Sequence, residues 1–130
     1  TVRGNEERVM RKSFDSFTPM GPWIVTADEV SDPFDINMRL WVNGELRQQA
    51  NTRDLIVNIP QMIAIASSAA TLYPGDIIAS GTPAGVGPVV AGDVIHIEVG
   101  QVGEMHIPVV AGQRGQSIVF AKPYQFQRAS

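Results

Sequence analysis

Cysteine is absent from the 130-residue chain, and the chain has neither an excess of basic residues nor a long apolar run. Without cysteine there is no disulfide framework and no thiolate chemistry, which suits a reducing cytoplasm. The net charge of −3 lacks the cationic excess that a nucleic-acid surface needs. No apolar run reaches the length that crosses a membrane. We therefore expect a cytoplasmic protein that binds neither nucleic acid nor membrane.

Two common catalytic arrangements are missing as well. The two histidines, His96 and His106, have no cysteine partner and no metal-ligand spacing, and no Gly-x-Ser-x-Gly elbow occurs. These absences argue against a zinc centre and against a serine hydrolase built on such an elbow. Both histidines stand in segments of alternating polarity, where each is expected to face solvent opposite an apolar side.

The clearest local structure is a β-hairpin. Apolar residues alternate with Arg39 and Trp41 over residues 38–42, and Asn43-Gly44 follows, the pair that favours a two-residue type I′ turn. Residues 45–49 form the expected return strand. This hairpin predicts an antiparallel sheet with one apolar face.

One helix is predicted over residues 59–72. Asn58 can cap its first turn, Pro60 falls within that turn, and apolar residues recur at helical spacing along one face. Pro74 and Gly75 end the pattern. Because the rest of the chain indicates short strands, the fold class is predicted to be β-rich α+β.

The remaining segments complete this prediction. Residues 13–23, rich in aromatic residues, proline and glycine, are expected to form a rigid loop, and residues 1–12 either a short helix or an ordered loop. The expected strands and extended pieces are residues 24–26, 55–57, 76–79, 94–99, 104–110 and 117–120. The run 76–79 is apolar enough for a strand covered on both faces.

A glycine-rich turn follows at residues 81–87. Its glycines allow backbone conformations that side chains forbid, so the turn can direct amide N–H groups and the Thr82 hydroxyl at an anion. A tight β-turn without a ligand explains the same residues. The turn matches neither a Walker pattern nor a dinucleotide-binding pattern.

Lys12 stands where a polar segment meets the aromatic loop. A cation fixed there could hold a carboxylate or stabilise a developing enolate. A solvated surface lysine is the alternative that the residues alone leave open.

Five blocks occur in order along the chain. They are Lys12-Ser13-Phe14-Asp15, residues 19–26 (PMGPWIVT), residues 40–45 (LWVNGE), Asn51-Thr52 and residues 72–87 (LYPGDIIASGTPAGVG). Together they resemble the fumarylacetoacetate hydrolase family, from the first residues to about Val110. The match corresponds to the C-terminal half of that family's catalytic domain, so the chain is expected to be a C-terminal portion whose upstream part is missing.

The resemblance implies a mixed β-roll and an enzyme that needs Mg2+ or Mn2+, with Ca2+ in some members. It implies a homodimer that acts on 2-oxo acids or 1,3-diketone-like compounds. We expect C–C bond hydrolysis of the acylpyruvate type through a metal-stabilised enolate. Enol–keto isomerisation or decarboxylation of hydroxymuconate-type diacids is the alternative within the family, and a non-catalytic binding or subunit-pairing module is the alternative of another class.

The resemblance also implies site residues. Lys12 matches the family's active-site lysine, and Ser16 stands in the place of a nearby hydroxyl residue. Thr82, with Gly81, matches the threonine at the glycine turn, and Arg3 is a further expected substrate contact. The family's metal is held by a Glu-x-Glu pair and an aspartate, which are expected upstream of Thr1, so no metal ligand is expected in this chain.

Overall fold

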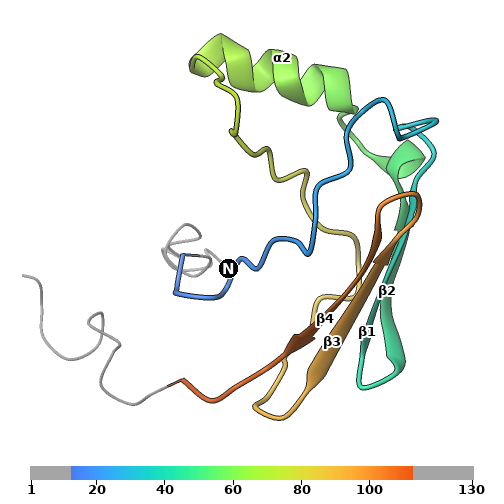
Figure 1. The fold of residues 1–130 in the computed structure, drawn as a ribbon, viewed down its shortest axis with the longest axis vertical. Coiled ribbons are helices and arrows are strands. Elements are labelled where there is room, and N and C mark those ends of the chain that lie inside the picture. The colour runs from blue at the N-terminus through green and yellow to red at the C-terminus, as the bar shows by residue number, and fades with distance from the viewer. Residues whose placement is uncertain (1–12, 113–130) are drawn as a thin grey trace, which may run out of the picture.

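The computed structural model describes residues 13–112 and contains one four-stranded antiparallel sheet. The strand order is β2-β1-β3-β4, and Figure 1 shows helix α2 beyond one end of this sheet. In chain order the elements are β1 (Asn37–Val42), β2 (Glu45–Asn51), the short 3-10 helix η1 (Thr52–Asp54), α2 (Ile59–Ala69), β3 (Val94–Val99) and β4 (Gly103–Pro108).

The predicted hairpin is confirmed as β1 and β2. Asn43 and Gly44 both have positive φ, 50° and 83°, as a type I′ turn requires. Pairing is regular beside the turn and then shifts, because Trp41 pairs with Leu46 while Leu40 pairs with Gln48. Arg47 is therefore a bulge residue, and the side chains beyond it change faces.

The register gives the sheet an apolar face. Residues of β1 and β3 pair across it as Met38 with Val99, Leu40 with Ile97, and Val42 with Ile95. Alternation within a strand sends these six side chains to the same side. Because Gln48 pairs with Leu40, the bulge places the Gln48 amide on this apolar face.

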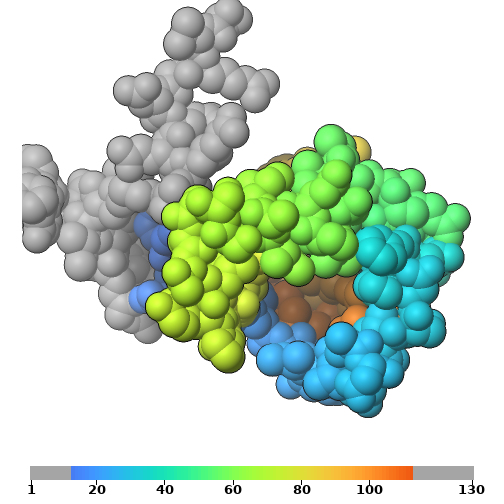
Figure 2. Space-filling model, turned by 90° about the horizontal axis from the view of Figure 1, so that it is seen from above, coloured from blue at the N-terminus to red at the C-terminus, as the bar shows by residue number. Residues whose placement is uncertain are grey.

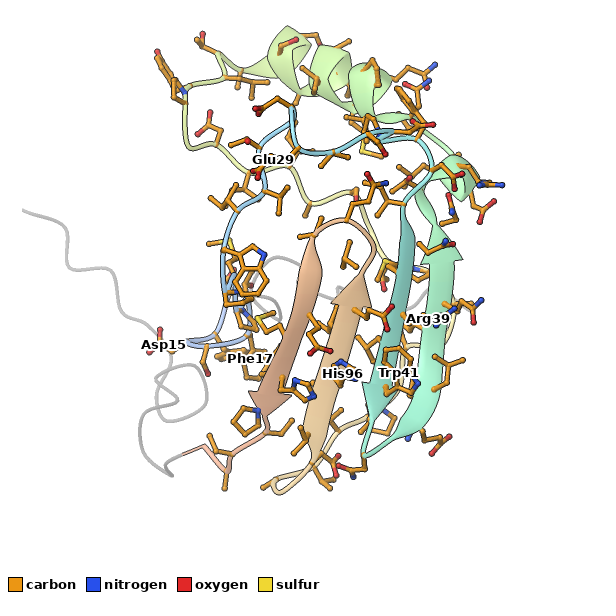
Figure 3. All side chains as sticks on the ribbon, turned by 45° about the vertical axis from the view of Figure 1, so that its right-hand side comes forward. Asp15, Phe17, Glu29, Arg39, Trp41 and His96 are labelled. Carbon is orange, nitrogen blue, oxygen red and sulfur yellow. The ribbon has the colours of Figure 1, made fainter. Side chains whose placement is uncertain are left out.

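The opposite face carries a stack of rings. His96 lies between Trp41 and His106, with ring centroids 4.8 and 4.2 Å away, and its Nε2 lies 3.0 Å from Glu104 Oε2. Figure 3 shows Trp41 and His96 side by side on neighbouring strands. The histidines thus lie opposite the apolar side, as predicted. His96, however, is half-buried by its neighbours instead of simply solvated.

Helix α2 begins as predicted and ends earlier. Asn58 accepts a hydrogen bond from the Gln61 amide, and the Gln61 side chain accepts one from the Asn58 amide, which completes a capping box. The helix stops at Ala69, short of the predicted residue 72. None of its residues is buried by the described part of the chain.

The strand predicted over residues 94–99 is confirmed as β3, and the one predicted over 104–110 is present as β4, which ends at Pro108. Two other predicted strands are wrong. Residues 24–26 and 76–79 form no strand, and residues 56–57 form bends. Within residues 13–112 the apolar run 76–79 finds no partner strand, so Ile77 is 68% exposed. The loop prediction for residues 13–23 is confirmed, with a cis Gly21-Pro22 bond. The predictions for 1–12 and 117–120 fall outside the described residues.

The core formed by residues 13–112 is small. Val42 and Gln48 are the two buried residues of this range, whereas Ile24 and Ile56 are almost or fully exposed. Figure 2 shows a hollow between α2, the segment after it and the segment before β1, with β3 and β4 at its floor. No helix in the described range has the length and apolarity needed to span a membrane.

Candidate functional site

The glycine turn is packed directly onto the bulge of β2. Gly85 has φ +99°, and a Cβ atom there would lie 1.8 Å from the Arg47 carbonyl oxygen. No residue with a side chain fits at that position unless the backbone moves. Gly81, with φ +101°, needs glycine for its conformation alone, since nothing lies within 4 Å of its missing Cβ. The turn is thus seated on the sheet at Gly85.

A second anchor is the amide of Gln48. Its Nε2 donates to Thr82 Oγ1 at 2.9 Å and to the Pro83 carbonyl oxygen at 3.0 Å. The Gln48 residue is 8% exposed. A hydrogen bond shielded from water is worth more than an exposed one, and a buried amide without partners is costly. The Gln48 amide therefore ties the turn to β2 at Thr82, the residue predicted from the sequence as a substrate contact.

Thr82 and Gly81 themselves are exposed. Within residues 13–112 the Thr82 hydroxyl accepts the bond from Gln48 and donates to no protein acceptor. A hydroxyl group has one proton and two lone pairs, so its proton is available to a ligand. The arrangement provides one fixed donor at an open surface, which suits an acceptor oxygen of a small molecule.

Arg47 adds a positive charge beside the same turn. A Cβ atom at Gly87 would lie 3.1 Å from Arg47 Nη1, so the guanidinium group lies against the end of the turn. Its Nε is 3.4 Å from Glu45 Oε1, an ion pair without a hydrogen bond. Such an arrangement favours an anion near the turn, but Glu45 offsets part of the charge.

The segment after the turn is held by Asp93. The backbone N–H of Val90 and the side-chain amide of Asn43 donate to its carboxylate, each at 2.8 Å. These two hydrogen bonds, in that order of importance, lower the pKa of Asp93 below its ordinary value. The segment that follows the glycine turn is thus fixed to the hairpin turn as well.

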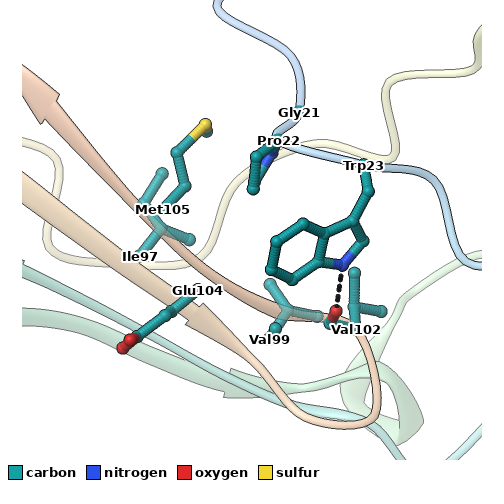
Figure 4. Close-up of a pocket in the computed structure, with 9 residues that line it drawn as sticks. Gly21, Pro22, Trp23, Ile97, Val99, Val102, Glu104 and Met105 are labelled. Carbon is teal, nitrogen blue, oxygen red and sulfur yellow. Dashed lines mark hydrogen bonds between the residues drawn. The ribbon is translucent and has the colours of Figure 1, made fainter.

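The aromatic loop is anchored to the sheet by Trp23. Its indole Nε1 donates to the Val102 carbonyl oxygen at 2.7 Å, and a Cβ atom at Gly103 would lie 2.6 Å from the ring. Figure 4 shows this ring beside a mainly apolar cavity of about 120 Å³ between the loop and strands β3 and β4. The loop that carries Ser16 is therefore held by a contact far along the chain.

Some of the predicted site residues lie together in the structure and others do not. Lys12 and Arg3 lie outside the described residues. Ser16 is exposed with φ 64°, and no hydrogen bond within the described range joins it to Gly81 or Thr82. Gly81 and Thr82 are together at the turn, and their roles in substrate binding stay predictions. Sequence reasoning missed Gln48, whose position depends on the bulge.

The described residues do not form a metal site. Between residues 13 and 112 there is no group of three or more His, Asp or Glu side chains that could hold a metal ion. The pair His96 and Glu104 lies on the opposite face of the sheet from Gln48. The prediction that the metal ligands lie elsewhere stays open.

The small antiparallel sheet with one helix matches the corresponding part of solved structures of one enzyme family. The sequence profile of the fumarylacetoacetate (FAA) hydrolase C-terminal family matches residues 3–110. The chain belongs to the fumarylacetoacetate hydrolase family. The resemblance seen in the sequence and the β-rich α+β fold are thereby confirmed.

Several relatives support this assignment. Maleylpyruvate hydrolase of Aquipseudomonas alcaligenes is 54% identical over 109 residues, 84% of this chain and 38% of the relative. The 4-hydroxyphenylacetate degradation bifunctional isomerase/decarboxylase of Salmonella dublin is 51% identical over 94 residues, 72% of this chain and 22% of the relative. The chain thus spans well under half the length of the relatives that it matches.

Solved structures agree with the sequence comparison. The crystal structure of maleylpyruvate hydrolase from Sphingobium sp. SYK-6 in complex with manganese (II) ion and pyruvate has a TM-score of 0.80 at 64% identity. The match covers 82% of this chain and 40% of that structure. The fold of this chain is therefore that of the corresponding part of the relative.

Proposed function

We propose that this chain is the C-terminal portion of a divalent-metal-dependent enzyme that cleaves a C–C bond in an acylpyruvate-type 2-oxo acid. Mn2+ is the proposed metal, by analogy with the manganese of the Sphingobium relative, with Mg2+ and Ca2+ as alternatives. The metal ligands are proposed to lie outside residues 13–112, because that range offers no suitable cluster. We also propose a cytoplasmic homodimer.

One observation carries the proposal: the glycine turn is fixed to the sheet while Thr82 and Gly81 stay exposed. A donor that is held in place before the substrate arrives binds an oxygen without a further ordering cost. In the proposed site the Thr82 hydroxyl and the backbone of Gly81 hold the substrate carboxylate. Lys12, Ser16 and Arg3 are proposed to contact the same small molecule.

A second reaction within the family is supported by a particular relative. The Salmonella dublin protein is named as an isomerase/decarboxylase and shares 51% identity over the matched residues. Enol–keto isomerisation or decarboxylation of a hydroxymuconate-type diacid is therefore the alternative. A carboxylate-binding turn would serve both reactions.

The proposal is tested with Thr82→Val in the intact enzyme loaded with Mn2+. This change removes the hydroxyl and keeps the shape, so KM for an acylpyruvate should rise about tenfold, as expected for one lost hydrogen bond to a charged group, while kcat changes little. Thr82→Ser should keep most of the affinity. Thr71→Val, at an exposed threonine in the segment after α2, is the matched control.

An unchanged KM in Thr82→Val would remove the proposed carboxylate site. Turnover of hydroxymuconate-type diacids, with none of acylpyruvates, would instead favour the alternative reaction. An intact protein that turns over neither class with Mn2+, Mg2+ or Ca2+ would support the non-catalytic module.

A further inference from the structure

The Gln48 amide and the Thr82 hydroxyl form a hydrogen-bonded pair whose direction is determined by chemistry. We infer that Gln48 is a positioning residue that fixes the Thr82 hydroxyl as a hydrogen-bond donor toward the substrate carboxylate. This inference rests on the proposed function of Thr82, and it assigns a role to a residue outside the predicted site.

The first step concerns the orientation of the amide. A backbone carbonyl oxygen can only accept hydrogen bonds, so the Gln48 atom 3.0 Å from the Pro83 oxygen is the NH2 nitrogen. The same nitrogen lies 2.9 Å from Thr82 Oγ1. An amide nitrogen has two protons and accepts no hydrogen bond, so one proton serves each oxygen.

The second step concerns the hydroxyl. Because Thr82 Oγ1 must accept the proton from Gln48, its own proton cannot point back at that nitrogen. Thr82 has no protein acceptor within residues 13–112, and its side chain is exposed. The hydroxyl proton is therefore directed outward, where a carboxylate oxygen can accept it. Donation from the Gln48 amide also polarises the hydroxyl and strengthens that bond.

The third step concerns how the sheet places this amide. Gln48 is 8% exposed and lies on the apolar face, opposite Leu40. Burial without partners would cost free energy, so the two acceptors on the turn hold the side chain in one orientation. The bulge at Arg47 turns the Gln48 side chain to the apolar face. Gln49, the residue after Gln48, pairs with Arg39 on the opposite face.

The experiment is a double-mutant cycle in the intact, Mn2+-loaded enzyme. Gln48→Met keeps the length of the side chain and removes the donor, so KM should rise roughly three- to tenfold with little change in kcat. In a Thr82→Val background the same change should alter KM by less than about twofold, because its effect passes through the hydroxyl. Gln49→Met, on the opposite face, is the matched control.

A second variant gives a readout that a structural role would not produce. In Gln48→Glu the ionised carboxylate accepts the Thr82 proton and turns the hydroxyl away, so KM should rise more than in Gln48→Met. When pH falls, the protonated acid can again donate, and the ratio of variant to wild-type KM should decrease. This variant also keeps the test available if Gln48→Met does not fold.

Three results separate the possible failures. Gln48 does not act through the hydroxyl if Gln48→Met raises KM equally in the wild-type and Thr82→Val backgrounds. The same conclusion follows if the ratio of Gln48→Glu to wild-type KM does not change with pH. If Thr82→Val raises KM but neither Gln48 variant does, the inference is wrong while the proposed function stands. If Thr82→Val leaves KM unchanged, the proposed function fails first.

Discussion

The sheet and the region between α2 and β3 differ in how far their residues are paired and buried by other parts of the described chain. Strands β1 to β4 pair with one another along their lengths, and Val42 and Gln48, the buried residues of the described range, both belong to them. The segment 70–93 contains no helix or strand, and Ile77, Val86 and Val90 are largely exposed. Both regions are rich in apolar residues, but their burial is not alike.

The difference teaches that apolar sequence indicates burial without saying what covers it. A hairpin brings its own partner, so its apolar face forms as soon as the turn closes. A run such as 76–79 needs a partner from elsewhere, and contiguous exposed apolar surface is typical of an interface. We therefore expect the apolar side chains around α2, including Ile56, and those of residues 76–79 to be covered in the intact protein, whereas the turn at Thr82 stays open.

The largest effect is expected for Gly85→Ala, because Gly85 is the point at which the region between α2 and β3 packs against the sheet. The new Cβ would meet the Arg47 carbonyl, and the φ of +99° disfavours alanine. The free energy of unfolding of the intact protein should fall by about 3 kcal/mol or more. KM should rise too, because the turn moves off β2.

The matched control is Gly92→Ala. Gly92 has the same φ of +99°, but nothing lies within 4 Å of its missing Cβ. Only the conformational cost remains, about 1–2 kcal/mol. Equal losses in the two variants, measured by denaturant unfolding, would show that the turn is not seated on β2.

An intermediate effect is expected for Ile56→Ser in the intact protein. Ile56 is fully exposed within the described range, so a covered position should lose about 1–3 kcal/mol, and a solvated one almost nothing. Leu46→Ser, in β2, is the comparison, because Leu46 is already partly covered here. If Leu46→Ser costs more than Ile56→Ser in thermal unfolding, the expected cover over Ile56 is absent.

The smallest effect concerns Asp93, which joins the two regions at the hairpin turn. Its pKa is lowered in the folded protein, so its contribution to stability is present above the ordinary aspartate pKa of 3.8 and is lost as pH falls through the folded pKa. Asp93→Asn should therefore flatten the fall in stability below about pH 4.

Asn43→Gly provides the control for Asp93, since glycine tolerates the positive φ and removes one of the two donors. It should reduce the same acid dependence in part. Unfolding midpoints measured between about pH 2.5 and 7 check both variants. If the loss of stability at low pH is the same in Asp93→Asn as in the wild type, Asp93 does not contribute to it.

The elements that could be predicted from the sequence are those with local signals. The Asn43-Gly44 turn and the Asn58 cap each act within a few residues, so the hairpin and the start of α2 were predictable. The strand predicted at residues 76–79 was wrong because pairing is decided by a partner far away in sequence. The end of α2 lacks such a signal too: Ala70 is already extended, with φ −148° and ψ 151°, before Pro74 and Gly75 are reached.

The site was predictable in part for a similar reason. The glycine turn and Thr82 stand out in the sequence, whereas Gln48 does not. A regular two-residue hairpin would pair Gln48 with Arg39 on the solvent face, and only the bulge pairs it with Leu40. No local pattern announces that extra residue, so the amide that holds Thr82 could not be found from the strand alone.

The bulge at Arg47 lets this arm of the hairpin hold one extra residue without turning Gln48 to the solvent face. Without Arg47 the two strands would still close around Asn43-Gly44, and Gln48 would pair with Leu40 in a regular ladder, on the same apolar face. A regular ladder with Arg47 retained would instead pair Gln48 with Arg39, turn the glutamine toward water and release the glycine turn from its amide anchor. The register of β2 therefore determines whether the Gln48 amide can reach Thr82.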